Sequence, residues 1–192
     1  MKNKQATYQQ GPWSLADLFP LADSPELAAA IKELEKKVAS FESHRATLDA
    51  AMPQKAFLQI IRGLEEITRL MHRISGYAEL RFAEDTQDQE ATTLLARMEQ
   101  MNAELSNRTM FFSLWWKSLD DDHAGHLMQN TGDYRYWLEE MRHFKPYTLS
   151  EPEEKIVNIK DVTGSNALVV LYDTITNRYA FKVAVDLSLI HI

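Results

Sequence analysis

The spacing of apolar residues is the feature that most constrains the fold of this chain. They recur every three or four positions along three long segments, of which the second and third cover residues 53–82 and 86–119. Only six Gly and six Pro interrupt the 192 residues, which disfavours a fold of many strands. The first segment follows a heptad pattern, with apolar residues at Leu27, Ile31, Leu34, Val38, Phe41 and Leu48. This periodicity predicts three long helices.

Local residues set the ends of these helices. Ser24 followed by Pro25 is a typical helix start, and we expect the first helix to run to about Ala51. Asp85 or Thr86 can cap the third helix. Since the connections are short, the three helices should pack antiparallel in an elongated bundle.

Shorter elements are expected after residue 120. Residues 120–132 are polar and predict a loop that holds at most one short helix. A helix over 134–144 follows. Ser150 and Glu153 have the spacing of a capping box, which starts another helix. We expect Thr163-Gly164 to end that helix.

The last part of the chain holds an apolar run and an alternating run. Residues 165–175 fit a helix or a buried strand, and we favour a helix because the apolar side chains share one face. Residues 177–185 alternate, which predicts a C-terminal β-strand or hairpin. No partner strand precedes it, so the partner is missing or lies in another chain. Residues 187–192 resemble the translation of a sequencing adapter and predict an artefactual tail; the alternative is a genuine β terminus that pairs with the preceding strand.

Together these patterns predict a mainly α fold. We divide the chain into a long-helix bundle at residues 1–120, a short-helix subdomain at 121–176, and a strand with its tail at 177–192. No internal repeat is visible in the sequence.

Composition and charge exclude several classes of protein. The chain has no Cys, which excludes disulfides, thiolate metal sites and a Cys nucleophile. Its 21 basic and 28 acidic residues give a net charge of −7 without a basic stripe, so we expect no nucleic-acid partner. The longest apolar stretch, Ala167–Tyr172, is far shorter than the roughly 20 residues that span a bilayer. The polar first residues predict no secretory signal, and we expect a cytoplasmic protein without a membrane partner.

Two polar clusters contain the residue types of metal sites, but neither has a complete pattern. His123 and His126 follow three Asp residues, yet no third ligand is specified. Glu140 and His143 form one Glu-x-x-His motif, whereas a di-iron bundle needs two such motifs and two further Glu. We interpret the first cluster as a solvated loop and the second as an exposed helix face.

The remaining candidates fit structural roles. The side chains of the adjacent pairs Glu65-Glu66 and Glu139-Glu140 point about 100° apart on a helix, so neither pair can share a proton without a tertiary arrangement. We interpret both pairs as solvated helix faces. The aromatic residues of segment 111–116 have helical spacing and predict core, with Trp116 off the seam and facing a second helix layer. Arg108 lies within a seam and predicts an ion pair to a facing helix, or alternatively a contact to a partner domain. We therefore assign no catalytic, cofactor-binding or metal-ligating residue.

Several stretches of the sequence resemble a known family. They are the aromatic segment 111–119, the segment 134–156 with its Leu-Ser-x-x-Glu-Glu-Lys-Ile ending, the continuation 160–179 and the opening 13–19. Together they resemble the N-terminal part of oligoendopeptidase F, from the thimet oligopeptidase-like zinc metallopeptidases. The resemblance extends over most of the chain, to about Asp186.

The resemblance implies a longer, mostly helical peptidase that encloses a channel between two helical halves and admits short peptides. Its zinc would lie on a His-Glu-x-x-His helix in a C-terminal catalytic part, and this chain contains no such motif. The resemblance therefore implies a scaffold fragment that is inactive alone, with zinc ligands outside this chain and its own catalytic domain as partner. The alternative is a non-enzymatic helical module whose heptad seams recruit a partner helix.

Overall fold

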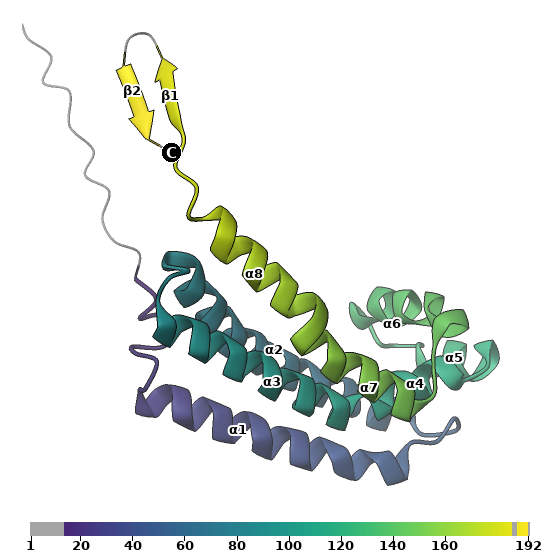
Figure 1. Ribbon diagram of the computed structural model, residues 1–192. Coiled ribbons are helices and arrows are strands. Elements are labelled where there is room, and N and C mark those ends of the chain that lie inside the picture. Colours follow the sequence, from purple (N-terminus) through teal and green to yellow (C-terminus); the bar gives the residue numbers. More distant parts are fainter. Residues whose placement is uncertain (1–13, 186–187, 192) are drawn as a thin grey trace, which may run out of the picture.

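The computed structural model describes residues 14–185 and 188–191, and this part of the chain is mainly helical, as the sequence predicts (Figure 1). Three long helices run back and forth beside one another, and shorter helices follow them. The long helices are α1 (Pro25–Glu42), α2 (Gln54–Glu84) and α3 (Gln89–Thr109). The shorter ones are α4 (Phe111–Ser118), α5 (Asp121–Leu127), α6 (Tyr134–His143), α7 (Glu151–Asp161) and α8 (Ala167–Thr176).

The first helix is shorter than the sequence predicts. It ends at Glu42 rather than near Ala51, and a single stretch of 3-10 helix, Ser43–Thr47, follows it. The hydroxyl groups of Ser43 and Thr47 donate to the carbonyls of Ser40 and His44, at 2.7 Å and 2.9 Å. Such local side-chain bonds compete with a regular α-helix. The heptad pattern also has Arg45 where an apolar residue would continue the seam between Phe41 and Leu48.

The third predicted helix is divided at one residue. α3 ends at Thr109 and α4 begins at Phe111, with Met110 between them in helical conformation. The Thr109 hydroxyl donates to the carbonyls of Leu105 and Ser106, at 3.3 Å and 3.2 Å. A hydroxyl bonded back into its own helix often bends it. The apolar seam therefore continues across a small break.

The prediction that Thr163-Gly164 ends the helix begun at Ser150 is wrong. The capping box of Ser150 and Glu153 is present, but α7 passes through a π-helical turn, Val162–Asn166, into α8. A single Gly in a helix costs only about 1 kcal/mol, which is too little to end it here. The prediction of a helix over the apolar run is confirmed from Ala167 onward.

The end of the described chain holds two short antiparallel strands, β1 (Lys182–Val185) and β2 (Ser188–His191). Residues 177–181, which the sequence analysis placed in a strand, are turn and irregular chain, so a strand of the predicted length is not supported. The structure pairs Lys182 with His191, so β1 has its partner within this chain. Residues 187 and 192 of the predicted tail, and residue 186 before it, lie outside the described part.

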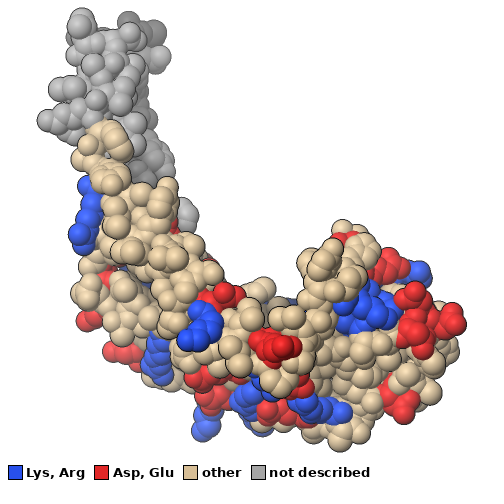
Figure 2. Space-filling model, turned by 45° about the vertical axis from the view of Figure 1, so that its right-hand side comes forward, with Lys and Arg blue, Asp and Glu red and all other residues tan. Residues whose placement is uncertain are grey.

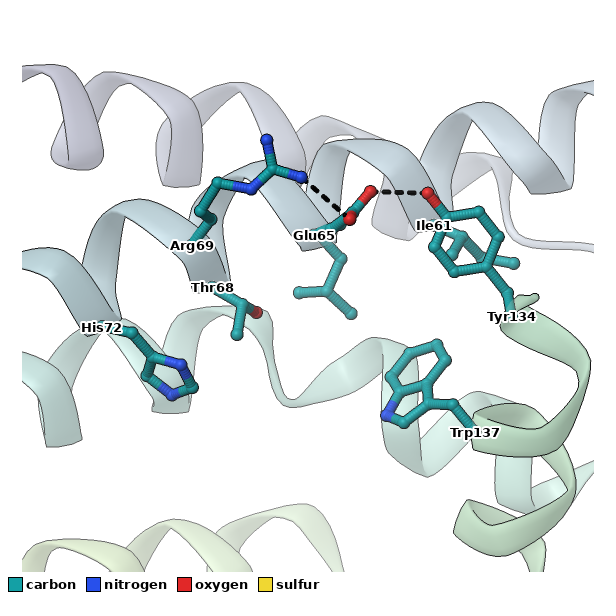
Figure 3. A pocket seen from close by; sticks show the side chains of 8 residues that line it. Ile61, Glu65, Thr68, Arg69, His72, Tyr134 and Trp137 are labelled. Carbon is teal, nitrogen blue, oxygen red and sulfur yellow. Dashed lines mark hydrogen bonds and ion pairs between the residues drawn. The ribbon is translucent and has the colours of Figure 1, made fainter.

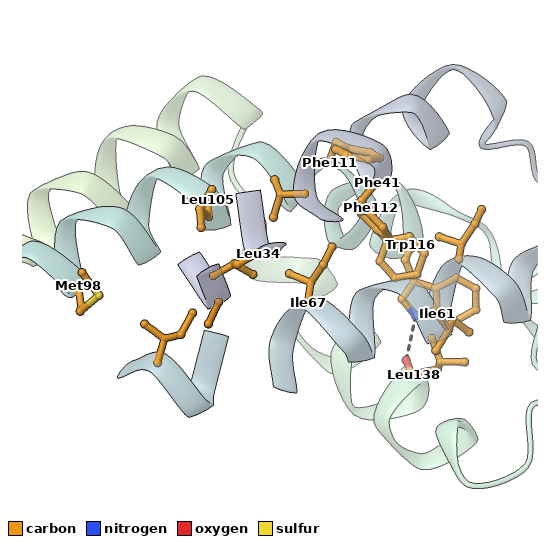
Figure 4. Close-up of a cluster of buried hydrophobic side chains, with 14 of the residues drawn as sticks. Leu34, Phe41, Ile61, Ile67, Met98, Leu105, Phe111, Phe112, Trp116 and Leu138 are labelled. Carbon is orange, nitrogen blue, oxygen red and sulfur yellow. Dashed lines mark hydrogen bonds between the residues drawn. The ribbon is translucent and has the colours of Figure 1, made fainter. Parts of the chain in front are cut away.

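The core lies between the three long helices and extends into α4, α5 and α6. The seam residues Leu34, Val38 and Met98 are at most 1% exposed. At one end the core becomes aromatic, where Phe111, Phe112 and Trp116 gather (Figure 4). Phe57 stacks on Trp116 there, with ring centroids 5.2 Å apart. The prediction that the aromatic segment of α4 forms core is therefore confirmed for its buried members, Phe111, Phe112 and Trp116.

Trp116 also fixes the position of α6, as its place off the seam predicts. Its indole Nε1 donates to the carbonyl oxygen of Leu138 at 3.0 Å, and both residues are fully buried (Figure 4). The guanidinium of Arg142 lies 5.6 Å from the Trp116 ring centroid. One side chain thus joins the bundle core to the second helix layer.

We predict that Trp116→Ala lowers the free energy of unfolding by about 3–5 kcal/mol, because it leaves a large cavity. Trp116→Phe should cost about 1–3 kcal/mol, because it keeps an aromatic ring but loses the buried hydrogen bond. Urea denaturation measures both. The control is Trp137→Phe on α6, which changes a side chain that is 40% exposed and should shift stability by less than about 0.5 kcal/mol. If Trp116→Phe and Trp137→Phe lowered the free energy of unfolding equally, this would contradict the stabilising role of the Trp116–Leu138 hydrogen bond.

Candidate functional site

The histidine pair of the first polar cluster lies within α5, and Asp120 before it caps this helix. Asp120 precedes α5, and its carboxylate accepts from the backbone N–H of His123 at 2.9 Å and lies 2.7 Å from the His123 ring Nδ1. The hydrogen bond from the His123 backbone is the first cause that lowers the pKa of Asp120. These contacts begin a short helix.

The other acidic and histidine residues that the sequence analysis considered make ordinary surface contacts. His143 Nδ1 lies 3.7 Å from a carboxylate oxygen of Glu140, and the His143 side chain is 71% exposed. Glu139 pairs with Arg135, and Glu66 pairs with Lys37 on α1. Within residues 14–185 and 188–191, no group of three or more His, Cys, Asp or Glu side chains could hold a metal ion. Zinc therefore does not fit the side chains described for this chain.

Arg108 makes the ion pair that its place in the seam predicts. Its Nε and Nη2 donate to the two carboxylate oxygens of Glu42 at 2.9 Å and 2.6 Å, which links α3 to the end of α1. This bidentate bond lowers the pKa of Glu42 and raises that of Arg108. The pair therefore holds the last residue of α1 against α3.

The candidate functional surface is the apolar face of α6, α7 and α8. Among the described residues, all but two of the exposed large apolar side chains lie between Tyr136 and Phe181. α8 is the extreme case, because Leu168 and Tyr172 are 67% and 66% exposed and few polar side chains interrupt the helix. Figure 2 shows a mostly uncharged, hollowed surface between the arm of α7 and α8 and the end that holds α6. Apolar patches of this kind mark interaction surfaces.

Polar contacts hold α7 to the bundle and leave its apolar side chains outside. Glu151 at the start of α7 forms an ion pair with Arg45, whose Nη1 donates at 2.8 Å. The Asn158 amide donates to the carbonyl of Ala103 on α3 at 2.9 Å and to Asn107 Oδ1 at 2.8 Å. Hydrogen bonds from Arg45 and then Lys155 lower the pKa of Glu151 to about 2.

A second polar junction holds α6. Arg142 is only 10% exposed, and it donates to the carbonyls of Trp116 and Leu119, each at 2.9 Å. Lys145 donates to the same Leu119 carbonyl at 2.6 Å. These cations satisfy the free carbonyls at the carboxyl end of α4, where the helix dipole favours positive charge. This junction holds α6 so that its first residue, Tyr134, contacts Glu65 on α2.

A pocket of about 370 Å³ lies between α2 and α6 (Figure 3). We call it the α2–α6 pocket, and its lining residues are Ile61, Leu64, Glu65, Thr68, Arg69, His72, Tyr134 and Trp137. The Tyr134 hydroxyl donates to a Glu65 carboxylate oxygen at 2.5 Å, across the two helices. This bond is the first cause that lowers the pKa of Glu65 and raises that of Tyr134.

Sequence reasoning missed both the α2–α6 pocket and the Arg45–Glu151 pair. Glu65 was interpreted as part of a solvated face, and nothing in the sequence shows that α6 crosses α2 at this point. A signal did exist for Arg45, because it occupies the position where the heptad pattern skips an apolar residue. For the pocket, the only signal was the spacing of Tyr134 and Trp137, which places both on one face of α6.

Comparison with known families identifies the region that carries the apolar face. Residues 115–181 match the N-terminal family model of the M3 peptidases. This stretch covers the second half of α4 and all of α5 to α8, and it is similar to the N-terminal part of M3-family metallopeptidases. More particularly, the model is described as oligopeptidase F, so this stretch is an oligoendopeptidase F-like N-terminal region, as the sequence resemblance implies. No curated protein and no solved structure matched the chain, and the bundle before residue 115 lies outside the family match.

None of the described helices combines the length and the apolar character that crossing a membrane requires. α8 itself, Ala167–Thr176, has ten residues.

We predict that Glu151→Gln lowers the free energy of unfolding at pH 7 by less than about 1 kcal/mol, because the pair is partly exposed. Folding depresses this pKa from its ordinary 4.5 to about 2. The contribution is therefore complete above about pH 4.5 and is lost as the pH falls through about 2. Urea unfolding of both proteins across this range should show their difference shrinking toward acid.

The matched control for this prediction is a double-mutant cycle with Arg45→Gln. The two single variants should share part of their loss, since each removes the same bond. Strictly additive losses, or a difference that stays constant between pH 5 and pH 2, would contradict the role of this pair.

Proposed function

We propose that this chain is the N-terminal helical portion of a cytoplasmic, zinc-dependent metalloendopeptidase that hydrolyses short peptides. The observation that carries the proposal is a coincidence of two independent features. The family match covers residues 115–181, and nearly all exposed large apolar side chains of the described chain lie within that range. A surface of this kind needs a partner, and an M3 peptidase supplies one in its own catalytic half.

In this proposal the chain is a scaffold. Zinc, when bound by the catalytic half, would polarise the peptide bond and activate water. No cluster in the described residues fits zinc, so we assign these side chains no step of the hydrolysis. Their part is to form a wall beside the substrate channel. The Trp116–Leu138 and Arg45–Glu151 contacts hold α6 and α7 at the two ends of this wall.

The alternative, a helical interaction module that recruits a partner through its heptad seams, has less support. The seam residues are the most buried side chains of α1 and α3, and Leu34 and Val38 have no exposed surface. A partner helix could reach them only if the bundle opened. The exposed apolar surface lies instead on α6 to α8, within the stretch that matches the peptidase family.

The experiment that tests the proposed function is to read the source DNA past the codon for Asp186. We expect the frame to continue to a His-Glu-x-x-His motif and a later Glu, because those residues would supply the zinc site. A genomic frame that stops after Ile192 would overturn the proposal, and the chain would then have to be studied as a structural or binding protein.

A peptidase assay on the isolated 192 residues is the matching control. Quenched fluorescent peptides of about eight residues should remain intact with and without added zinc. Cleavage that a chelator abolishes would show a metal site within this chain and would contradict its role as a scaffold.

We further predict that the isolated chain binds a hydrophobic dye and associates through α8. Leu168→Glu should reduce dye fluorescence and weaken association by several-fold, because it places a charge in the apolar face. The control is Leu21→Glu, since Leu21 is 64% exposed and Leu168 is 67% exposed, but Leu21 lies outside that face. Dye titration and sedimentation velocity measure both. Equal effects of the two substitutions would contradict the assignment of the surface to α8.

A further inference from the structure

The α2–α6 pocket has the shape of a small ligand site. Its α2 side is a single helical stripe, because positions 61, 64, 68 and 72 follow one another at steps of three or four. Its other side is the first turn of α6, which contributes Tyr134 and Trp137 (Figure 3). The volume of about 370 Å³ lies in the range of small-molecule pockets and can hold a large side chain with some of its backbone.

The floor of the pocket is apolar. Ile61 is 1% exposed and belongs to the core, so it gives the floor a fixed position. Leu64 lies beside it and is half-buried. The indole of Trp137 lies on the α6 side of the pocket (Figure 3). A bulky apolar group would find contact on several sides here.

The acidic group of the pocket, Glu65, already accepts hydrogen bonds from two other lining residues. One Glu65 oxygen accepts from Arg69 Nη2 at 2.9 Å, and the other accepts from the Tyr134 hydroxyl at 2.5 Å. Both bonds lower the pKa of Glu65 and keep it ionised. The carboxylate therefore serves to position Arg69 and Tyr134.

The charged group that remains free at the rim is a hydrogen-bond donor, whereas Thr68 and His72 can each donate or accept. Arg69 uses one of its guanidinium N–H groups on Glu65, and its side chain is 75% exposed. The described residues provide no acceptor for the indole Nε1 of Trp137, which is 40% exposed. An apolar floor with a donor-rich rim fits a ligand that carries acceptors beside a large apolar group. A guanidinium is also the preferred partner of a carboxylate.

We propose that the α2–α6 pocket binds the C-terminal residue of a short peptide. The apolar side chain of that residue lies on Ile61 and Leu64, its carboxylate accepts from Arg69, and Trp137 Nε1 donates to a carbonyl of the peptide backbone. The inference rests on the proposed function for the choice of a peptide as ligand.

Isothermal titration calorimetry with the 192-residue chain tests the proposal. The probes are acetyl-Ala-Ala-Phe with a free carboxylate, the same peptide as its C-terminal amide, and acetyl-Ala-Ala-Ala with a free carboxylate. We expect the first to bind at least about tenfold more tightly than the amide, because the amide loses a charged hydrogen bond. The Ala peptide should also bind more weakly, because it leaves the apolar floor empty.

Two variants assign the binding to the pocket. Arg69→Gln should abolish the preference for the acid over the amide, whereas the matched control Arg97→Gln, an exposed arginine of α3, should retain it. Trp137→Phe keeps the aromatic face and should weaken both Phe peptides by a similar factor. Circular dichroism checks that each variant is folded.

The proposal would be overturned if acid and amide bound equally, if Arg69→Gln retained the preference, or if no binding occurred up to millimolar peptide. No binding would leave the pocket as a docking point for a segment of the catalytic half. This test does not measure hydrolysis, so its failure is distinct from failure of the proposed function, which the genomic frame decides.

Discussion

The burial of one indole ring, that of Trp116, determines how the two parts of this structure are joined. Its six-membered and five-membered rings complete the aromatic end of the bundle core against Phe57, while its N–H reaches the backbone of α6 at Leu138. Arg142 then covers the ring and binds the carbonyls at the end of α4. Because the same side chain belongs to the core and to the junction, α6 cannot change its position without opening the core.

A second junction, at the start of α7, has a different character. It depends on an ion pair and on amide hydrogen bonds between α7 and α3, with little apolar burial. As a result, α7 and α8 are held to the bundle mainly by polar contacts, and most of their apolar side chains remain exposed. The two junctions hold a hollow, mostly uncharged face between them (Figure 2).

This arrangement explains why the family match and the exposed apolar surface coincide. A chain that buried these side chains within itself would need no partner, and α8 has the composition of a helix that is covered from several sides. The α2–α6 pocket opens on a stripe of α2 that begins at the core residue Ile61. We propose that the bundle serves chiefly as a rigid support for this face and for the pocket at its edge.

The sequence by itself determined the helical class, the seams and the capping box, because these depend on periodicity and on contacts within a few residues. It also showed a resemblance to a peptidase family, chiefly through residues 111–119 and 134–179. Only the tertiary structure decided where α1 ends, that α7 continues through Gly164 into α8, and that Glu65 meets Tyr134. The reason is physical: helix breaks depend on a small difference between local bonds and packing, and contacts between α2 and α6 depend on a crossing that the core residue Trp116 sets. Residue spacing contains no information about that crossing.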